Sequence, residues 1–420
     1  MGKKSHNLVV GLDIGSTAVR MAIGQLVERA ESRERELQIL GATEVPSEGL
    51  HRGIISSIED VVSSISSCLE RTERVVGASI DSVWLGVSGT HVMSQQSKGV
   101  VAVSKADSDI SEEDVRRAVE AARAIATPIN YEVLHVLPHS FGVDGQVGIK
   151  DPVGMTGIRL DVDAQIILGS SSQIKNLTKA VYRAGLDIED LVLSIIATAE
   201  AVLTGRQKDL GVAVVNIGGS TTSLAVYEEG DLLHNAVLPI GSEHITNDLA
   251  IGLRTTIDIA ERAKIKYGDC WHELAGKKDE IDLFELGAER QEMIKKKYLS
   301  EIIGARVEEI FYKVDQELKT IQRSGLLPAG VVLTGGGAKL PGLVESAKNN
   351  LRLPATLGYP FNITSVTDKI NDLGFSTAVG LVKWGSMMKF GGYSREDNKM
   401  GNKINAVFSQ FKKWTKTLIP

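Results

Sequence analysis

Residues 11–17 read Gly11-Leu12-Asp13-Ile14-Gly15-Ser16-Thr17, and their turn-like part, 13–17, lies between two short apolar runs, 8–12 and 19–23. This pattern predicts a strand, a turn and a second strand. In such a glycine-containing turn, successive backbone N–H groups can converge on an anion, and short hydroxyl side chains add further donors. An aspartate just before the turn is suited to hold Mg²⁺ through water, because this ion keeps most of its hydration shell. A single turn of this kind is also compatible with an ordinary hairpin.

The same pattern recurs much later in the chain, with strands expected at 211–217 and 223–227. The second turn reads Asn216-Ile217-Gly218-Gly219-Ser220-Thr221-Thr222, and a third glycine cluster reads Leu333-Thr334-Gly335-Gly336-Gly337-Ala338. The two hairpin turns fit neither the dinucleotide fingerprint nor the P-loop, which need other glycine spacings or a Gly-Lys-Ser/Thr ending. A hairpin repeated at this distance predicts two similar half-molecules.

The bulk composition excludes several classes of protein. With 420 residues, 43% hydrophobic and 24% charged, the chain has room for several domains with their own cores. A net charge of −6 argues against nucleic acid as a partner, because nucleic-acid binders carry clustered basic charge. The two cysteines, Cys68 and Cys270, lie far apart and indicate neither a disulfide framework nor a metal knuckle, so we expect a reducing compartment. The sequence contains no run of about eighteen apolar residues free of charge, so we expect no membrane-spanning helix.

Helical periodicity is found in several segments between and after the hairpins. Ser111 is predicted to cap a helix, with Asp114 three residues later. Further helices are expected at 176–185, 190–203, 247–267 and 292–322. After Lys389 the sequence becomes polar and glycine-led, which is typical of a linker.

Two hairpins followed by a Gly-Gly-Gly turn, in that order, resemble the nucleotide site of the actin, Hsp70 and sugar kinase superfamily. Within this superfamily the chain is similar, over essentially its whole length, to the FtsA family of bacterial cell-division proteins. The segments that carry this likeness are 10–16, 241–248, 260–268 and 332–342, together with a tethered C-terminal helix.

The resemblance implies an α/β fold, the actin-like (ribonuclease H-like duplicated) two-lobed ATPase fold, with an inserted small αβ subdomain and a C-terminal amphipathic helix. The first lobe core is expected at 1–84, with 164–195 and 365–390 returning to it, and the inserted subdomain at 85–163. The second lobe core is expected at 196–242 and 305–364, and its small subdomain at 243–304. A linker at 391–403 and a membrane-binding helix at 404–420 complete the expected division.

The resemblance also implies that ATP and Mg²⁺ bind between the lobes, with Asp13 as the Mg²⁺ ligand and with Glu261 and Lys264 reaching the ribose and adenine. The expected nucleotide-binding residues are Asp13, Gly15, Ser16, Thr17, Asn216, Gly218, Gly219, Ser220, Thr221, Glu261, Lys264, Gly335, Gly336 and Gly337. Taken alone, the charges at 261–264 would also fit a solvated helix face.

Two departures from the superfamily pattern predict weak catalysis. The second hairpin normally begins with aspartate, but here the residue is Asn216. The segment 193–199, where Hsp70-like relatives place a water-polarising glutamate, has no carboxylate, and Glu200 is expected to be a helix-surface charge. Phosphoryl transfer depends almost entirely on positioning and electrostatics. We therefore name no catalytic residue and expect at most a weak ATPase, with binding retained better than hydrolysis.

The C-terminal segment from Ile404 to Pro420 predicts an amphipathic helix with no acidic residue. Its apolar side chains fall within an arc of roughly 140° at about 100° per residue, with lysines outside it. This composition is typical of a helix that lies in the headgroup region of a membrane, although a final helix docked on the protein's own core is the usual alternative. The expected membrane-binding residues are Ile404, Val407, Phe408, Phe411, Lys412, Lys413, Trp414, Lys416, Leu418 and Ile419.

Together with these features, the resemblance implies a structural adaptor: a membrane-tethered, ATP-binding, actin-like polymer that recruits the division protein FtsZ for septum formation. Its expected partners are FtsZ, further copies of itself, anionic lipids and later division proteins, at the cytoplasmic face of the cell membrane at the division site. An acidic FtsZ tail is expected to meet a basic group formed by Lys295, Lys296, Lys297 and Arg306, unless these charges are only a solvated helix face. The alternatives are a small-molecule kinase or true ATPase, and a pilus-assembly scaffold related to FtsA.

Overall fold

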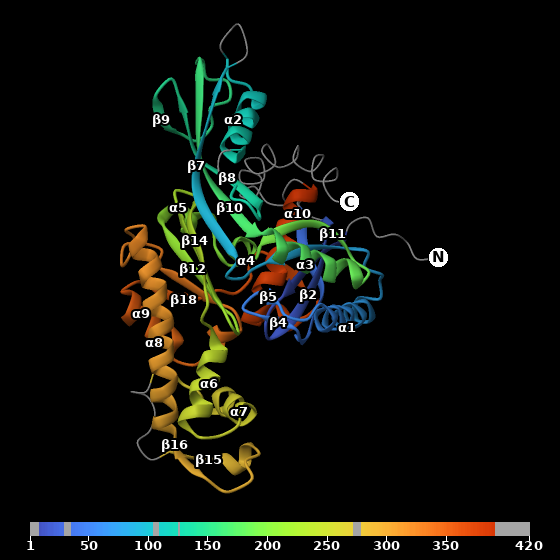
Figure 1. The fold of residues 1–420 in the computed structure, drawn as a ribbon, viewed down its shortest axis with the longest axis vertical. Coiled ribbons are helices and arrows are strands. Elements are labelled where there is room, and N and C mark those ends of the chain that lie inside the picture. Colours follow the sequence, from blue (N-terminus) through green and yellow to red (C-terminus); the bar gives the residue numbers. More distant parts are fainter. Residues whose placement is uncertain (1–7, 29–34, 104–108, 125–126, 272–278, 391–420) are drawn as a thin grey trace.

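The computed structural model describes residues 8–28, 35–103, 109–124, 127–271 and 279–390. The expected linker 391–403 and the expected membrane-binding helix 404–420 lie outside these residues. Figure 1 shows two central lobes side by side, a module that projects from them at the top, and a small subdomain at the bottom. Within the described part of the chain, no helix has both the length and the apolar character that a membrane crossing requires.

The first lobe is built on a mixed sheet with the order β11-β6-β1-β2-β3-β19 in the described residues. Along β1 (Leu8–Ile14), Val9 packs into one core while Val10 and Leu12 pack into another, so both faces of the sheet are covered. Helices α1 and α3 cover one face, and α4 and α10 cover the other. The remaining elements are β2 (Ala18–Glu28), β3 (Arg35–Pro46), β6 (Ser82–Val87), β11 (Asp187–Leu193), β19 (Thr364–Ser365), α1 (Ile58–Val76), α3 (Ser171–Arg183), α4 (Ser194–Val202) and α10 (Ser376–Phe390).

The second lobe repeats this plan with a sheet of order β14-β13-β12-β17-β18 among the described strands. As in the first lobe, an antiparallel hairpin (β12–β13) has a parallel strand, β17, on its other side. A helix that runs along this lobe, α8, buries Phe311 and Val314 against the sheet. The elements are β12 (Val212–Ile217), β13 (Thr222–Glu228), β14 (Asp231–Leu238), β17 (Val331–Thr334), β18 (Ala355–Leu357), α5 (Gly205–Leu210), α8 (Lys296–Thr320) and α9 (Leu343–Leu351).

The projecting module is an antiparallel sheet of order β7-β10-β8-β9 with α2 (Glu112–Ala124) packed on it. The predicted cap of α2 is confirmed, because Ser111 N donates to Asp114 Oδ2 at 3.0 Å and Asp114 N donates to Ser111 Oγ at 3.4 Å. The module's strands run from Val92 to Ser170, so Leu85 belongs to β6 of the first lobe. They are β7 (Val92–Ala102), β8 (Tyr131–Val143), β9 (Gln146–Ile149) and β10 (Arg159–Ser170).

The small subdomain below the second lobe contains α6 (Ser242–Gly252), α7 (Ile257–Tyr267), β15 (Glu280–Asp282), the short helix η2 (Leu283–Leu286) and β16 (Met293–Lys295). The single helix predicted at 247–267 is wrong, because the chain turns between α6 and α7. Arg254 there has a φ of 51°, and Thr256 Oγ1 accepts the hydrogen bond from Ile259 N that starts α7.

Three other predicted helices have different bounds. The predicted helix 190–203 begins as the strand β11, because residues 187–193 pair with β6. The predicted helix 292–322 begins only at Lys296, after β16 has paired with β15. The helix predicted at 176–185 starts earlier, at Ser171, and ends before Gly185.

Candidate nucleotide-binding site

A cavity of about 390 Å³ lies between the two lobes. All the expected nucleotide-binding residues line it except Ser220, whose side chain is buried and accepts a hydrogen bond from Arg52 N of the first lobe. The residues that line it are Asp13, Gly15, Ser16, Thr17, Asn216, Gly218, Gly219, Thr221, Glu261, Lys264, Gly335, Gly336 and Gly337. A second cavity, of about 720 Å³, is lined by residues 338–345 and by later segments, and no residue of either hairpin turn lines it. The candidate site is therefore the smaller cavity.

The two hairpin turns face each other across this cavity. Each turn is closed in the same way: Gly15 N donates to Ala18 O at 3.1 Å, and Gly218 N donates to Thr221 O at 2.9 Å. Ser220 N in turn donates to Ser16 Oγ at 3.1 Å. Because glycine and hydroxyl residues of both turns line the same cavity, the arrangement is suited to an anion held between the lobes.

Asp13 lies at the end of β1 and presents its carboxylate to the cavity. Burial among protein atoms raises the pKa of Asp13 from 3.8 to about 6, while the nearby Arg20 acts in the opposite direction. A bound cation would favour the ionised form of this carboxyl. The described residues contain no cluster of three or more His, Cys, Asp or Glu side chains that could hold a metal. One carboxylate beside an anion site nevertheless fits Mg²⁺, which keeps several waters and binds through one or two carboxylates together with phosphates.

Asn216 occupies the corresponding position at the end of β12 and has a different environment. Its Nδ2 donates to Thr377 Oγ1 of α10 at 3.1 Å, which connects the second hairpin to the first lobe. A Cβ at Gly335, where φ is 91°, would lie 2.2 Å from Asn216 Oδ1. The third glycine turn therefore packs directly on this amide, and it leads into the short helix η3 (Gly336–Lys339).

Glu261 and Lys264 lie one turn apart on α7 and point to the same wall of the cavity. Lys264 Nζ is 2.6 Å from Glu261 Oε2 and donates to Thr246 Oγ1 at 2.7 Å. The lysine side chain is only 11% exposed, against 41% for the glutamate. The lysine thus holds the carboxylate in place while the carboxylate remains accessible from the cavity.

Four further residues lie in or beside this site, although no role was predicted for them from the sequence: Arg20, Ser242, Glu243 and Thr377. Arg20 Nε lies 3.1 Å from Glu44 Oε2, and its guanidinium carbon is 5.7 Å from the centre of the Phe375 ring. Its position in β2 shortly after the first turn could have indicated it, because alternate residues of a strand share a face.

Glu200 is not a surface charge, and that prediction is wrong. The helix α4 is buried along its whole length between other elements, so Glu200 has almost no contact with solvent. Its Oε1 is 2.7 Å from Nζ of the equally buried Lys208, which lies 5.0 Å from the centre of the Tyr227 ring. Burial, and then the charge of Glu200, raises the pKa of Tyr227 well above its ordinary value. This ion pair is not part of the cavity lining.

The expected partner-binding lysines lie where β16 meets α8, with Lys295 and Lys297 exposed and Lys296 half-buried. Arg306 is engaged elsewhere: its Nε and Nη2 lie 2.5 and 2.8 Å from the carboxylate of Asp248 on α6, and Glu309 neutralises it further. It therefore adds little free positive charge to the lysine group. The expected membrane-binding residues from Ile404 to Ile419 lie outside the described residues.

Comparison with known proteins gives matches over nearly the whole chain. The family model for the cell division protein FtsA matches residues 213–380, and the model for the SHS2 domain inserted in FtsA matches residues 89–168. The FtsA of Pseudomonas aeruginosa is 35% identical over 93% of this chain and 92% of its own length. The FtsA of Bacillus subtilis is 36% identical over 90% and 84%, and that of Escherichia coli is 31% identical over 97% of both.

Solved structures of similar fold have much lower sequence identity. The PilM-PilN type IV pilus biogenesis complex matches with a TM-score of 0.64 and 18% identity, over 90% of this chain and 98% of the other. MreB5 of Spiroplasma citri bound to ADP matches with a TM-score of 0.52 and 12% identity, over 92% and 99%. These likenesses concern the fold, and they confirm the predicted two-lobed actin-like class.

Proposed function

This chain belongs to the FtsA family of bacterial cell-division proteins, and on that premise we propose that it is an ATP-binding, polymerising adaptor that anchors FtsZ to the cytoplasmic membrane. Its process is cell division, and its fold is actin-like. The observation that carries the finer proposal is the interlobe cavity, where the two hairpin turns, the carboxylates of Asp13 and Glu261 and the third glycine turn meet.

ATP with Mg²⁺ is the ligand that this donor set fits best. The two turns offer N–H and hydroxyl donors to phosphates, Asp13 offers a carboxylate to a hydrated cation, and Glu261 offers one to a ribose. Isothermal titration of the intact protein with ATP and Mg²⁺ tests the proposal, and the absence of any binding would overturn it.

Hydrolysis is expected to be slow in this adaptor. The carboxylates that line the described cavity are Asp13 and Glu261, and neither lies on the second hairpin or at the start of α4. Ser194, the first residue of α4, lines the cavity with a hydroxyl and not with a carboxylate. A small-molecule kinase on this fold would require such a group. The likeness to a pilus complex rests on the fold alone, so the curated relatives favour cell division.

Membrane attachment is assigned to the segment 404–420. Partial burial of its apolar side chains should yield several kcal/mol, while its three lysines add about 1 kcal/mol each near an anionic leaflet. Trp414→Glu should therefore abolish flotation with anionic vesicles, and the matched variant Lys413→Gln should only weaken it. Deletion of 404–420 should release the protein and leave ATP binding intact. Flotation of Trp414→Glu at the natural level would contradict membrane attachment through this helix.

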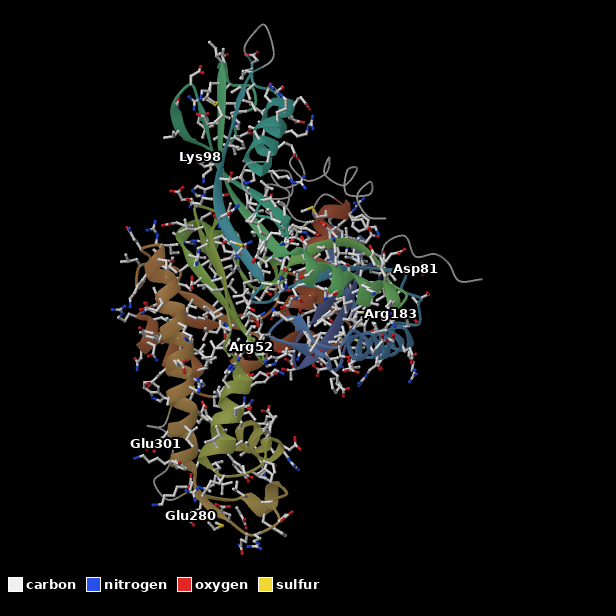
Figure 2. All side chains as sticks on the ribbon, viewed as in Figure 1. Arg52, Asp81, Lys98, Arg183, Glu280 and Glu301 are labelled. Carbon is white, nitrogen blue, oxygen red and sulfur yellow. The ribbon has the colours of Figure 1, made fainter. Side chains whose placement is uncertain are left out.

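The acidic tail of FtsZ is proposed to dock at Lys295, Lys296 and Lys297. Exposed apolar side chains lie beside them, with Met293 52% and Tyr298 46% exposed, and an amphipathic acidic peptide could use both. Charge reversal of the three lysines should weaken binding of an FtsZ tail peptide most strongly at low salt. Lys98→Glu is a control at the opposite end of the molecule (Figure 2). Unchanged affinity in the triple variant would remove this site.

A further inference from the structure

Hydroxyl groups of the two hairpins form hydrogen bonds across the lobes. Arg52, labelled in Figure 2, lies in the loop between the short strands β4 (Leu50–His51) and β5 (Ile54–Ile55). Its backbone N donates to Ser220 Oγ at 3.0 Å. Thr17 Oγ1 of the first hairpin donates to Glu243 Oε1 of α6 at 3.2 Å. The Thr17–Glu243 contact differs from the Arg52–Ser220 and Ser220–Ser16 contacts because its acceptor is a carboxylate.

The backbone fixes Glu243 directly against the second hairpin. Ser242 N donates to Gly218 O at 2.9 Å, and Glu243 N donates to Gly219 O at 2.8 Å, so the first turn of α6 is bonded to the turn itself. A Cβ built on Gly219 would lie 2.1 Å from Thr17 Oγ1 and 2.5 Å from Glu243 Oε1. The carboxylate therefore stands beside Thr17 and Gly219, which line the cavity, while Glu243 itself lies just outside the lining.

This position makes Glu243 a competitor of bound phosphate. Thr17 has a single hydroxyl proton, so it can donate either to Glu243 or to a phosphate oxygen. The Glu243 carboxylate and a phosphate bound near Thr17 would also repel each other, because both are negative. This repulsion is stronger in a partly enclosed cleft than in bulk water. A nucleoside triphosphate brings one more phosphoryl charge between the hairpins than a diphosphate does. The carboxylate should therefore penalise the triphosphate more.

We propose that Glu243 is a specificity-determining residue that lowers the affinity for nucleoside triphosphate relative to diphosphate, and that the triphosphate breaks the Thr17–Glu243 contact between the lobes. This inference rests on the nucleotide binding proposed above. It goes beyond that proposal by naming Glu243 and by predicting that the charge of Glu243 weakens triphosphate binding more than diphosphate binding.

The test is a comparison of ATP and ADP affinities, each with Mg²⁺, in the natural protein and in Glu243→Gln. The glutamine keeps the size of the side chain and an oxygen that can accept from Thr17, but it removes the charge. We expect ATP to bind about tenfold more tightly to the variant, which is about 1.4 kcal/mol. ADP affinity should change by less than about threefold, because fewer phosphate charges face the lost carboxylate.

Glu280→Gln is the matched control, since it removes the same charge from an exposed position in β15 at the far end of the small subdomain (Figure 2). It should leave both affinities unchanged. Thr17→Val removes the competing donor, and Glu243→Gln should then improve ATP binding less in that background than in the natural one. This double-variant comparison separates competition for the Thr17 hydroxyl from the effect of the Glu243 charge alone.

The possible outcomes distinguish a failure of the proposed nucleotide binding from a failure of the role proposed for Glu243. If the natural protein binds neither nucleotide, the proposed function and this inference both fail. If it binds ATP but Glu243→Gln leaves the ratio of ATP to ADP affinity unchanged, or lowers ATP affinity, only the inference is overturned.

Discussion

The two hairpin turns are closed by the same backbone hydrogen bond, but the residue before the turn is a carboxylate in the first hairpin and a neutral amide in the second. In the first, Asp13 carries a carboxylate whose ionisation is opposed by burial. In the second, Asn216 is neutral and donates to Thr377 across the lobes. A duplicated backbone can thus present a carboxylate to the cavity from one lobe and a structural contact from the other.

The largest effect is expected when the first hairpin is made like the second. Asp13→Asn should lower affinity for ATP with Mg²⁺ by about 10- to 100-fold, because a cation bound through water loses its charged partner. Affinity measured with EDTA in place of Mg²⁺ should change little. Calorimetric titration with and without Mg²⁺ measures both. Full retention of the Mg²⁺ dependence would show that the two hairpins do not differ in this role.

The same variant should change the pH dependence of stability in the nucleotide-free protein. Because the pKa of Asp13 is raised from 3.8 to about 6, the folded state binds this proton more tightly than the unfolded chain. Stability should therefore fall as pH rises from 3.8 to about 6, and Asp13→Asn should not show that loss. Above this range the variant should be more stable, by at most about 3 kcal/mol.

Urea unfolding at about pH 4 and about pH 7.5 measures this difference. The variant's advantage should be nearly complete at the higher pH and much smaller at the lower one, where the folded carboxyl is protonated and the unfolded one only partly ionised. An equal advantage at both values would mean that the charge of Asp13 is not its cause.

A smaller effect is expected when the second hairpin is made like the first. Asn216→Asp should raise the rate of ATP hydrolysis by about tenfold, less than the 10²–10⁴ of a well-placed acid or base, because the hydroxyl of Thr377 still holds the side chain. Phosphate release in single-turnover experiments measures it, with Asn216→Ser as the uncharged control. No increase would indicate that the missing carboxylate at the start of α4 limits the reaction.

Much of the site could be predicted because its signals are local. The backbone conformation of a glycine-containing turn between two apolar runs depends on residues within the turn itself. The cap at Ser111 depends on a residue only three positions away. Segments whose state depends on distant partners were predicted less well. Residues 190–193 look helical in isolation, but hydrogen bonds from β6, far away in the sequence, make them a strand.

The sequence by itself determined the two hairpins and the third glycine turn, because apolar periodicity and glycine act over a few residues. The α/β class and the family followed from the likeness that these and other motifs carry. Only the tertiary structure decided the environment of each charge. It buried Glu200 against Lys208, paired Arg306 with Asp248 and brought Glu243 to Thr17. Solvation and pairing depend on which elements pack together, and these residues meet only after the two lobes and their subdomains have assembled.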